Sequence, residues 1–326
     1  MDEPRTVRRS AGVGAVEGKP WIGASAYWMP RHIVESAWLE HAPFGFWIVD
    51  ALRPRIIVEL GTHNGFSYFV FCEAIARLGL SGTRSFALDS WLGDDQAGFY
   101  GDEVYQSVAA INTTEYAEFS TLLKGYFDDS LEFIEDGSVD LLHIDGRHGY
   151  DDVRHDFTAW LPKLSARGVV VLHDIAEHTE GFGVWQFWAE VSGRYPSFAF
   201  DHEHGLGIIA VGPEMPEAMR AFLEAAGRDP EAVKTAYQTI GEVVSRQYQL
   251  ELAPKESERL RGELAQANQQ LEAQRQRLEA QNHEIGLQRA DLEGLRNLVD
   301  EMRASSSWRV TGPLRAASDL LHGRKP

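Results

Sequence analysis

"RIIVELGTHNGFS", residues 55–67, gives the clearest indication of the fold in this sequence. An apolar run rich in β-branched residues ends at Leu60, glycines follow at Gly61 and Gly65, and a helical pattern starts near Ser67. An apolar run without alternation is typical of a strand that is buried on both faces. Gly61 allows a tight turn, and Gly65 allows a ligand to approach the backbone where the first N–H groups of a helix are unpaired. The stretch therefore predicts a strand, a ligand-binding loop and a helix.

The same strand–helix alternation continues along the chain. Further apolar runs occupy residues 84–89, 120–125, 139–145 and 168–174, with helical segments between most of them. Two last runs, at 197–202 and 206–212, are separated only by a short turn that contains glycine. This order predicts an α/β fold with a doubly wound, mostly parallel sheet and an antiparallel hairpin at one edge. Ligands of such sheets bind at the carboxyl ends of the strands.

Composition and charge narrow the possible functions. The 326 residues are 44% hydrophobic and 25% charged, which is usual for a soluble globular protein, and the net charge of -18 argues against a nucleic-acid partner. Cys72 is the only cysteine, which excludes an internal disulfide or a cysteine-rich zinc site and favours a reducing cytoplasm. The N-terminal residues lack the apolar core of a secretory signal, and no run approaches the ~18 apolar residues of a membrane span. We expect a cytoplasmic protein.

The pattern predicts four regions. Residues 1–20 form a disordered N-terminus, 21–250 a folded domain with C-terminal helices, 251–305 a coiled-coil helix and 306–326 a basic amphipathic tail. In the third region apolar residues recur every seven positions, with mixed residues three positions further on, as in the core of a coiled coil: Leu264, Leu271, Leu278, Ile285, Leu292 and Val299, then Ala267, Gln274, Gln281, Gln288, Leu295 and Met302. We expect a homo-oligomer through this helix, and a solvated single helix is the alternative.

The tail carries opposite charge to the rest of the chain. From Ser306 onward, four basic residues stand against Asp319, which gives +3, and Trp308, Val310, Leu314 and Leu321 supply apolar contacts. This combination favours peripheral contact with the anionic inner face of a cell membrane. A frayed end that caps the coiled coil is the alternative.

Polar residues near Gly61 match the groups of one particular cofactor. Glu59 can receive an amine, Ser67 and the helix N-terminus suit a carboxylate, and Asp89 at the end of the second strand can receive two ribose hydroxyls. A dinucleotide fingerprint is absent. Together these residues indicate an aminoacyl-nucleoside, S-adenosylmethionine (SAM).

The segment from Arg55 to about Gly212 resembles the class I SAM-dependent methyltransferases, in particular bacterial O-methyltransferases that act on sugars and small molecules. The similarity rests on "VELGTHNGFS" (58–67), "LDSWLGD" (88–94) and "HIDGRHGYDDVRHD" (143–156). It implies a Rossmann-like sheet and a cofactor bound by Glu59, Gly61, Thr62, Gly65, Ser67, Asp89 and Trp91. It also implies that Trp91, Gly93 and Asp94 shape the adenosine side.

Acidic and imidazole groups lie at the ends of the fourth and fifth strands. Asp145, His173 and Asp174 can converge there, because parallel strands end at one rim, and they suit Mg²⁺ or Mn²⁺. The related sugar O-methyltransferases bind a metal with an Asp and an Asp-Asp pair, which Asp145 and Asp174 match and His173 alters. The position of the proposed catalytic base in those enzymes is Arg147 in this sequence. We therefore expect His148 to act as the base in its place, with Asp145 as the second catalytic residue. The alternative for His148 is a helix cap.

Three nearby side chains have structural interpretations. His143, inside an apolar strand, is expected to be a core histidine. Trp185 and Trp188 are expected either to pack against the sheet or to form an apolar wall beside the acceptor.

The sequence thus predicts an SAM-dependent methyltransferase that methylates a sugar hydroxyl of a cell-surface glycan or related metabolite, assisted by a divalent metal. The ending "SSSWRVTGPLR" (305–315) after a heptad helix resembles the C-termini of bacterial polysaccharide-assembly proteins. Two alternatives remain: a catalytically degenerate scaffold in a polysaccharide-assembly complex, which Arg147 favours, and a hydroxylase-like tailoring protein.

Overall fold

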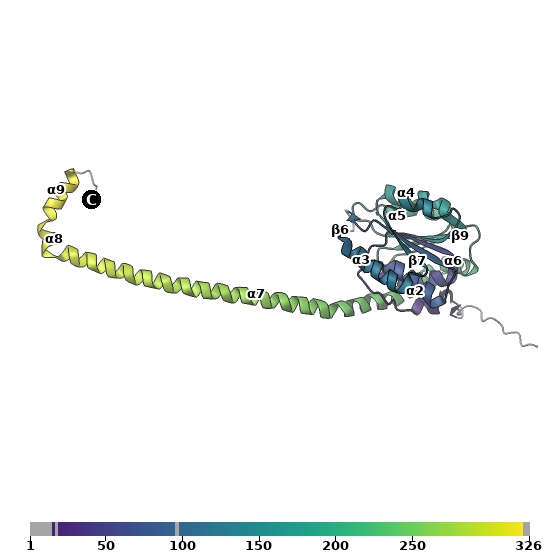
Figure 1. Ribbon diagram of the computed structural model, residues 1–326, viewed down its shortest axis with the longest axis horizontal. Coiled ribbons are helices and arrows are strands. Elements are labelled where there is room, and N and C mark those ends of the chain that lie inside the picture. Colours follow the sequence, from purple (N-terminus) through teal and green to yellow (C-terminus); the bar gives the residue numbers. More distant parts are fainter. Residues whose placement is uncertain (1–14, 17–18, 95–97, 322–326) are drawn as a thin grey trace, which may run out of the picture. The chain divides into compact units, whose positions relative to one another are not determined.

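A computed structural model gives the structure of the protein and describes residues 15–16, 19–94 and 98–321. The chain divides into two compact units, one that ends at Glu251 and one that begins at Leu252. In the first unit helices cover both faces of a central sheet. Figure 1 shows α4 (Tyr150–Trp160) and α5 (Val184–Val191) on one face and α2 (Phe66–Leu78) on the other.

Within the described residues the central sheet has seven strands, in the order β10-β11-β9-β8-β3-β4-β7. The five strands β9, β8, β3, β4 and β7 pair in parallel, whereas β11 is antiparallel to both β9 and β10. Their bounds are β3 (Ile56–Leu60), β4 (Arg84–Asp89), β7 (Ser120–Lys124), β8 (Val139–Ile144), β9 (Leu164–His173), β10 (Ser197–Phe200) and β11 (Leu206–Ala210). The predicted Rossmann-like sheet with an antiparallel hairpin is therefore confirmed.

β3 lies at the centre of this sheet, between β8 and β4. Its residues from Ile57 to Leu60 are completely buried, because helices cover both faces there. This explains why the sequence of the strand shows no alternation between apolar and polar residues. β9 begins earlier than the predicted residue 168, because Leu164 already pairs with Val139 before a shift in register.

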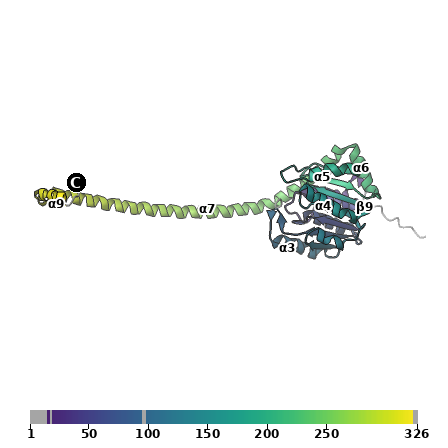
Figure 2. The same cartoon turned by 90° about the horizontal axis from the view of Figure 1, so that it is seen from above.

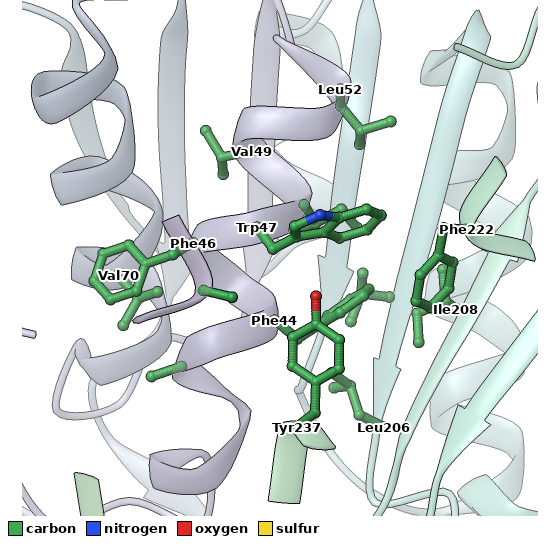
Figure 3. Close-up of a cluster of buried hydrophobic side chains, with 14 of the residues drawn as sticks. Phe44, Phe46, Trp47, Val49, Leu52, Val70, Leu206, Ile208, Phe222 and Tyr237 are labelled. Carbon is green, nitrogen blue, oxygen red and sulfur yellow. The ribbon is translucent and has the colours of Figure 1, made fainter. Parts of the chain in front are cut away.

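The larger core lies between the sheet and a helix that the sequence did not predict, α1 (Ala42–Leu52). Figure 3 shows Phe44 and Trp47 of this helix facing Phe222 and Tyr237, which belong to α6 (Glu217–Arg228) and α7 (Pro230–Ala304). The rings of Trp47 and Phe222 are 4.9 Å apart, a separation typical of favourable aromatic packing. These contacts fix the helical end of the first unit against the sheet.

The opposite face of the sheet is covered by α4 and α5, which lie over it when seen from above in Figure 2. A third apolar cluster joins α2 and β4 to α3 (Asp102–Ile111). Short strands complete the unit: β1 (Ala15–Val16), β2 (Lys19–Gly23), β5 (Gly93–Asp94) and β6 (Gly98–Phe99).

The two ends of the chain are described in part. Of the predicted N-terminal segment 1–20, residues 1–14 and 17–18 lie outside the described residues, and the remaining ones belong to β1 and β2. After α7 come α8 (Ser306–Val310) and α9 (Gly312–Leu321), and Arg324 and Lys325 of the predicted basic tail lie outside the described residues. Among the described helices, none is both long and apolar enough to span a bilayer.

One buried carboxylate holds the amino ends of the central strands together. Asp140 on β8 is 1% exposed and accepts hydrogen bonds from the Arg55 backbone N–H at 2.8 Å, from Arg55 Nη2 at 2.9 Å and from Ser165 Oγ at 2.5 Å. Burial raises the pKa of Asp140, but the hydrogen bonds from Arg55 and Ser165 outweigh burial and hold the pKa below its ordinary value.

Asp140→Asn is expected to lower the free energy of unfolding at pH 7 by about 2–3 kcal/mol, because a charge-assisted network loses its anion. The pKa of Asp140 is lower in the folded than in the unfolded chain, so this stabilisation is present above about pH 4 and is lost as the pH falls further. Urea unfolding of both proteins across this range measures the difference. Asp136→Asn is the control, because Asp136 pairs with Lys163 but is 71% exposed. An equal loss in both variants would contradict the prediction.

Candidate active site

A cavity of about 890 Å³ opens at the carboxyl ends of β3, β4, β7, β8 and β9. This volume is within the range of small-molecule sites, and the position is where doubly wound sheets bind their ligands. Every segment that follows one of these strands contributes to the lining. These segments include Gly61–Asn64, Asp89–Ser90, Gly125–Asp128, Asp145–His148 and His173–Asp174.

Gly61 allows the loop after β3 to lie directly against the end of β8. Its φ is +90°, and a Cβ atom added there would lie 1.9 Å from the backbone oxygen of Asp145. Gly65, with φ of +82°, precedes α2, and no side chain caps that helix. The first N–H groups of α2 therefore remain for a ligand, and Phe66 and Ser67 line the cavity beside them.

Asp89 holds the loop in place through three backbone hydrogen bonds. Its Oδ2 accepts from the N–H groups of Thr62 and His63, both at 2.8 Å, and its Oδ1 accepts from the N–H of Trp91 at 2.7 Å. A carboxylate has about four acceptor positions, so these bonds leave about one for a ligand. Asp89 therefore has a structural role that the sequence did not indicate, because it holds the loop that forms one wall of the cavity.

Trp91 and Gly65 support the cavity from behind its surface. Trp91 is buried, has φ of +50° and donates from Nε1 to the backbone oxygen of His63 at 3.0 Å. An added Cβ on Gly65 would meet the ring of Phe69 at 2.8 Å. Neither residue is part of the lining, whereas Gly61, Thr62, Ser67 and Asp89 are. Gly93 also lines the cavity, and the side chain of Asp94 lies outside the description.

Glu59 and His143 form a buried pair on adjacent strands and are not part of the lining. Glu59 Oε2 lies 2.8 Å from His143 Nδ1, and both side chains are completely buried. Burial raises the pKa of Glu59, and the neighbouring His143 and Ser67 oppose this rise. The ring of His143 also contacts Trp38 and Phe71, so it occupies the core position that the sequence indicated. The other carboxylate oxygen, Oε1, is buried and has no hydrogen-bond partner among the described residues.

An acid–imidazole cluster forms where the ends of β8 and β9 line the cavity. His148 Nε2 lies 2.8 Å from Asp174 Oδ2 and 3.8 Å from Asp145 Oδ1. His173 Nδ1 lies 3.2 Å from Asp145 Oδ1 and 3.4 Å from Asp174 Oδ2. The structure therefore brings together all four residues that the sequence proposed for catalysis and metal binding.

Asp145, His148 and Asp174 are arranged as a possible ligand set. One potential ligand atom of each lies within 4.8 Å of those of the other two. Ligand atoms of a first-row metal or Mg²⁺ lie ~2.0–2.2 Å from the ion, so two ligand atoms of one ion are at most about twice that distance apart. The spacing within this set is close to that limit. The set differs from the predicted one, because His148 takes the place of His173. Asp174 has φ of +60°, and this left-handed turn follows the end of β9 directly.

The cluster has strongly altered protonation. Burial lowers the pKa of both imidazoles, but the carboxylates Asp145 and Asp174 outweigh it, so that the pKa of His148 rises to about 9 and that of His173 rises well above its usual value. Burial raises the pKa of Asp174, yet His173 and His148 lower it to about 2. Without a metal, His148 therefore carries a proton at neutral pH, and only its loss frees the imidazole to act as a base.

Several lining residues were not identified from the sequence. Glu35, Ser36, Ala37 and Trp38 precede α1, and His204 comes from the β10–β11 turn. Asp156 on α4 also lines the cavity, and burial raises its pKa to about 7. By contrast, Trp188 lies against Gly207 of β11 in the core, and Trp185 contacts His178; neither belongs to the lining.

A known protein family matches the part of the chain that contains most of the residues lining the cavity. Residues 58–175 match the family described as "Methyltransferase domain". The uncharacterized protein y4gI of Sinorhizobium fredii is 56% identical over 184 residues, which are 56% of this chain and 20% of that protein. The chain thus spans about a fifth of the length of this curated relative.

Solved structures show more distant similarity. The O-methyltransferase TomG from Streptomyces achromogenes, solved with SAM, is 18% identical over 61% of this chain and 100% of its own, with a TM-score of 0.40. A methyltransferase from Geobacter sulfurreducens is 14% identical over 55% of this chain and 79% of its own, with a TM-score of 0.41. These values are too low to carry an activity or a substrate over to this chain. Residues 58–175, which run from β3 to the turn after β9, are assigned to a methyltransferase domain by the family match.

Proposed function

We propose that this protein binds SAM along the Gly61–Ser67 loop and transfers its methyl group to a hydroxyl of a neutral acceptor, such as a sugar of a cell-surface glycan. The observation that carries the proposal is that this loop and the cluster of Asp145, His148 and Asp174 line one cavity. Bound SAM supplies an electrophilic methyl group on a sulfonium. The protein then has to orient the acceptor and remove its hydroxyl proton.

Unsatisfied polar groups around the loop fit the amino-acid end of SAM. Thr62 Oγ1 and Glu59 Oε1 are buried without hydrogen-bond partners among the described residues. Thr62 lines the cavity, and Glu59 lies beneath Ser67, which does so too. The hydroxyl of Thr62 suits an ammonium group, and the open N-terminus of α2 suits a carboxylate, whereas Glu59 is not part of the lining. The remaining acceptor position of Asp89 suits a ribose hydroxyl.

The charge of the cavity favours a neutral acceptor. Eight carboxylates contribute to the lining and would repel a phosphorylated or otherwise anionic substrate, whereas they favour the sulfonium cation; they are Glu35, Asp89, Asp128, Asp145, Asp151, Asp152, Asp156 and Asp174. Aromatic side chains are also part of the lining, and Phe99 and Tyr126 are 76% and 70% exposed. Such surfaces suit the C–H face of a sugar, which supports a sugar hydroxyl as the acceptor.

We further propose that Asp145, His148 and Asp174 hold Mg²⁺ or Mn²⁺ next to the acceptor. Two carboxylates and one imidazole form a donor set that both ions accept. His173 Nδ1 touches both carboxylates and would orient them as an outer partner. In this arrangement His148 would bind the ion as a neutral imidazole after releasing its proton to solvent. The ion would make the acceptor hydroxyl more acidic, and the hydroxyl proton would pass to the carboxylate of Asp145.

Calorimetric titration of the full chain with SAM tests the proposal. We expect a Kd in the micromolar range, and we expect Asp89→Ala to raise it about 30-fold, because Thr62, His63 and Trp91 lose their common acceptor. Asp136→Ala, at the amino end of β8, is the control and should leave the Kd unchanged. Mass spectrometry of a glycan acceptor should show a gain of one methylene unit. No binding at millimolar SAM would favour the scaffold, and a gain of one oxygen atom would favour a hydroxylase.

A further inference from the structure

The second unit exposes an apolar seam along α7 that nothing in the described chain covers. The six apolar residues of the seven-residue repeat are between 43% and 68% exposed, and they are Leu264, Leu271, Leu278, Ile285, Leu292 and Val299. Such a continuous exposed seam on a helix is typical of a surface that pairs with another helix. The charges beside the seam indicate which helix that is.

Residues that flank the seam differ in charge between its two sides. In the heptad with Leu264 at position a, the five charged residues at position e are all arginines: Arg261, Arg275, Arg289, Arg296 and Arg303. The remaining e positions are Asn268 and Asn282. On the other side, position g holds Glu263, Gln270, Arg277, Glu284, Asp291 and Leu298. One side of the seam is thus basic and the other is mainly acidic or neutral.

We propose that α7, from residue 257 to 303, pairs with α7 of a second copy of this chain as a parallel, in-register, two-stranded coiled coil. In a parallel pair each g residue faces the e residue of the following heptad in the other chain. Glu284 then faces Arg289 of the second copy, and Asp291 faces Arg296. Glu263 and Arg277 face asparagines, and Gln270 and Leu298 face arginines, so no like charges meet.

An antiparallel pair of identical helices would give the opposite result. Position e then faces position e of the other copy, and g faces g. Arginine would meet arginine along one side, and on the other side Glu284 and Asp291 would lose Arg289 and Arg296 as partners and face a row of g residues in which Arg277 alone is basic. The charge pattern therefore favours the parallel orientation and disfavours the reverse.

Glutamines in the seam favour two strands. Gln274, Gln281 and Gln288 occupy three successive d positions, and in a parallel, in-register pair each faces its own copy, so that the amides can hydrogen-bond to each other. In a two-stranded coil these side chains also retain access to water, whereas larger bundles would bury them completely at a desolvation cost. The glycines Gly262, Gly286 and Gly294 lie at positions f, b and c, outside the seam.

Cysteine cross-linking in the full chain tests the orientation. Leu271→Cys and Val299→Cys both place a thiol in the seam, four heptads apart, and Gln276→Cys places one on the outer face as a control. The native Cys72 is buried and should not react. We expect oxidation to link both seam variants at least about tenfold faster than the control, since in the parallel pair each cysteine lies beside its own copy. Linking at only one seam position, or equal linking of the control, would overturn the proposal.

Mass and charge reversal test the stoichiometry and the pairing. The particle mass should be that of two chains of 36.5 kDa, and a monomer or a trimer would overturn the two-stranded arrangement.

Glu284→Arg with Asp291→Arg should weaken the dimer about 10- to 100-fold, because two symmetry-related sets of attractive pairs become repulsive. Adding Arg289→Glu and Arg296→Glu to the same chain should restore the Kd within about threefold. A first variant that leaves the dimer unweakened, or a second variant that fails to restore it, would overturn the proposal.

Discussion

Replacement of Asp145 or Asp174 by asparagine is expected to lower kcat/KM for methyl transfer about a thousandfold while the Kd for SAM changes less than about threefold. Both carboxylates contact His148 and His173, and they line the same cavity as the Gly61–Ser67 loop. Asparagine keeps the shape but removes the anion that would orient the imidazoles and accept charge from the acceptor proton. Steady-state kinetics and calorimetry on the same preparations measure the two effects separately.

Asp151→Asn is the matched control for this experiment. Asp151 lines the same cavity, so the substitution removes one negative charge from it without altering the cluster. We expect its kcat/KM to stay within about threefold of the parent protein. If all three variants lose activity equally, the general charge of the cavity matters and the cluster has no special part in turnover.

The same variants separate the role of a metal from that of the bare cluster. We expect the parent protein to bind one Mn²⁺, observed by the loss of the free-ion signal in electron paramagnetic resonance, and Asp145→Asn to weaken that binding at least tenfold. Parent protein that turns over fully in the presence of a chelator would contradict the metal proposal. It would leave the carboxylates in place as partners of the histidines.

The sheet could be predicted because its strands carry a local signal, whereas the first helix does not. The strands that hold the site are apolar runs bounded by glycine or acidic residues, and each run lies where the structure has a strand. In α1, every residue from Phe44 to Val49 is buried. A helix that is apolar all round shows no repeat of polar and apolar residues, so its sequence resembles that of a buried strand.

The site residues that could be predicted are those that lie directly at the ends of strands. Asp145, His173 and Asp174 meet because β8 and β9 are parallel neighbours, a fact that the topology alone implies. Tyr126 and Phe127 could have been found in the same way, since they follow β7. Glu35 and Trp38 could not, because the segment before α1 reaches the cavity only through long-range packing.

Glu59 shows the limit of reasoning from strand ends. It is the last residue but one of β3, and the pleat directs its side chain toward His143 and the helix-covered core. The register of a strand determines which face of the sheet each of its side chains points to. A continuous apolar run does not reveal that register. Asp89 shows another limit: its bonds to Thr62, His63 and Trp91 depend on a loop conformation that sequence spacing does not specify.

Gly61→Ala is expected to destabilise the folded protein by at least about 4 kcal/mol and to raise the Kd for SAM about a hundredfold. Part of this cost, about 1–2 kcal/mol, comes from the positive φ of +90°. The rest follows because the new Cβ would lie 1.9 Å from the Asp145 oxygen, so the loop after β3 and the end of β8 have to separate. That separation moves the Gly61–Ser67 loop, which we propose binds SAM, away from the cluster beside it.

Gly79→Ala isolates the effect of the close contact. Gly79 ends α2 with φ of +63°, but an added Cβ would meet nothing within 4 Å. We therefore expect only the conformational cost of about 1–2 kcal/mol and an unchanged Kd for SAM. Urea unfolding followed by fluorescence, together with SAM titration, compares the two variants. If Gly61→Ala behaves like Gly79→Ala in both measurements, the approach of the two strand ends is not what holds the cofactor loop against Asp145, and the proposed alignment of methyl donor and acceptor loses its structural basis.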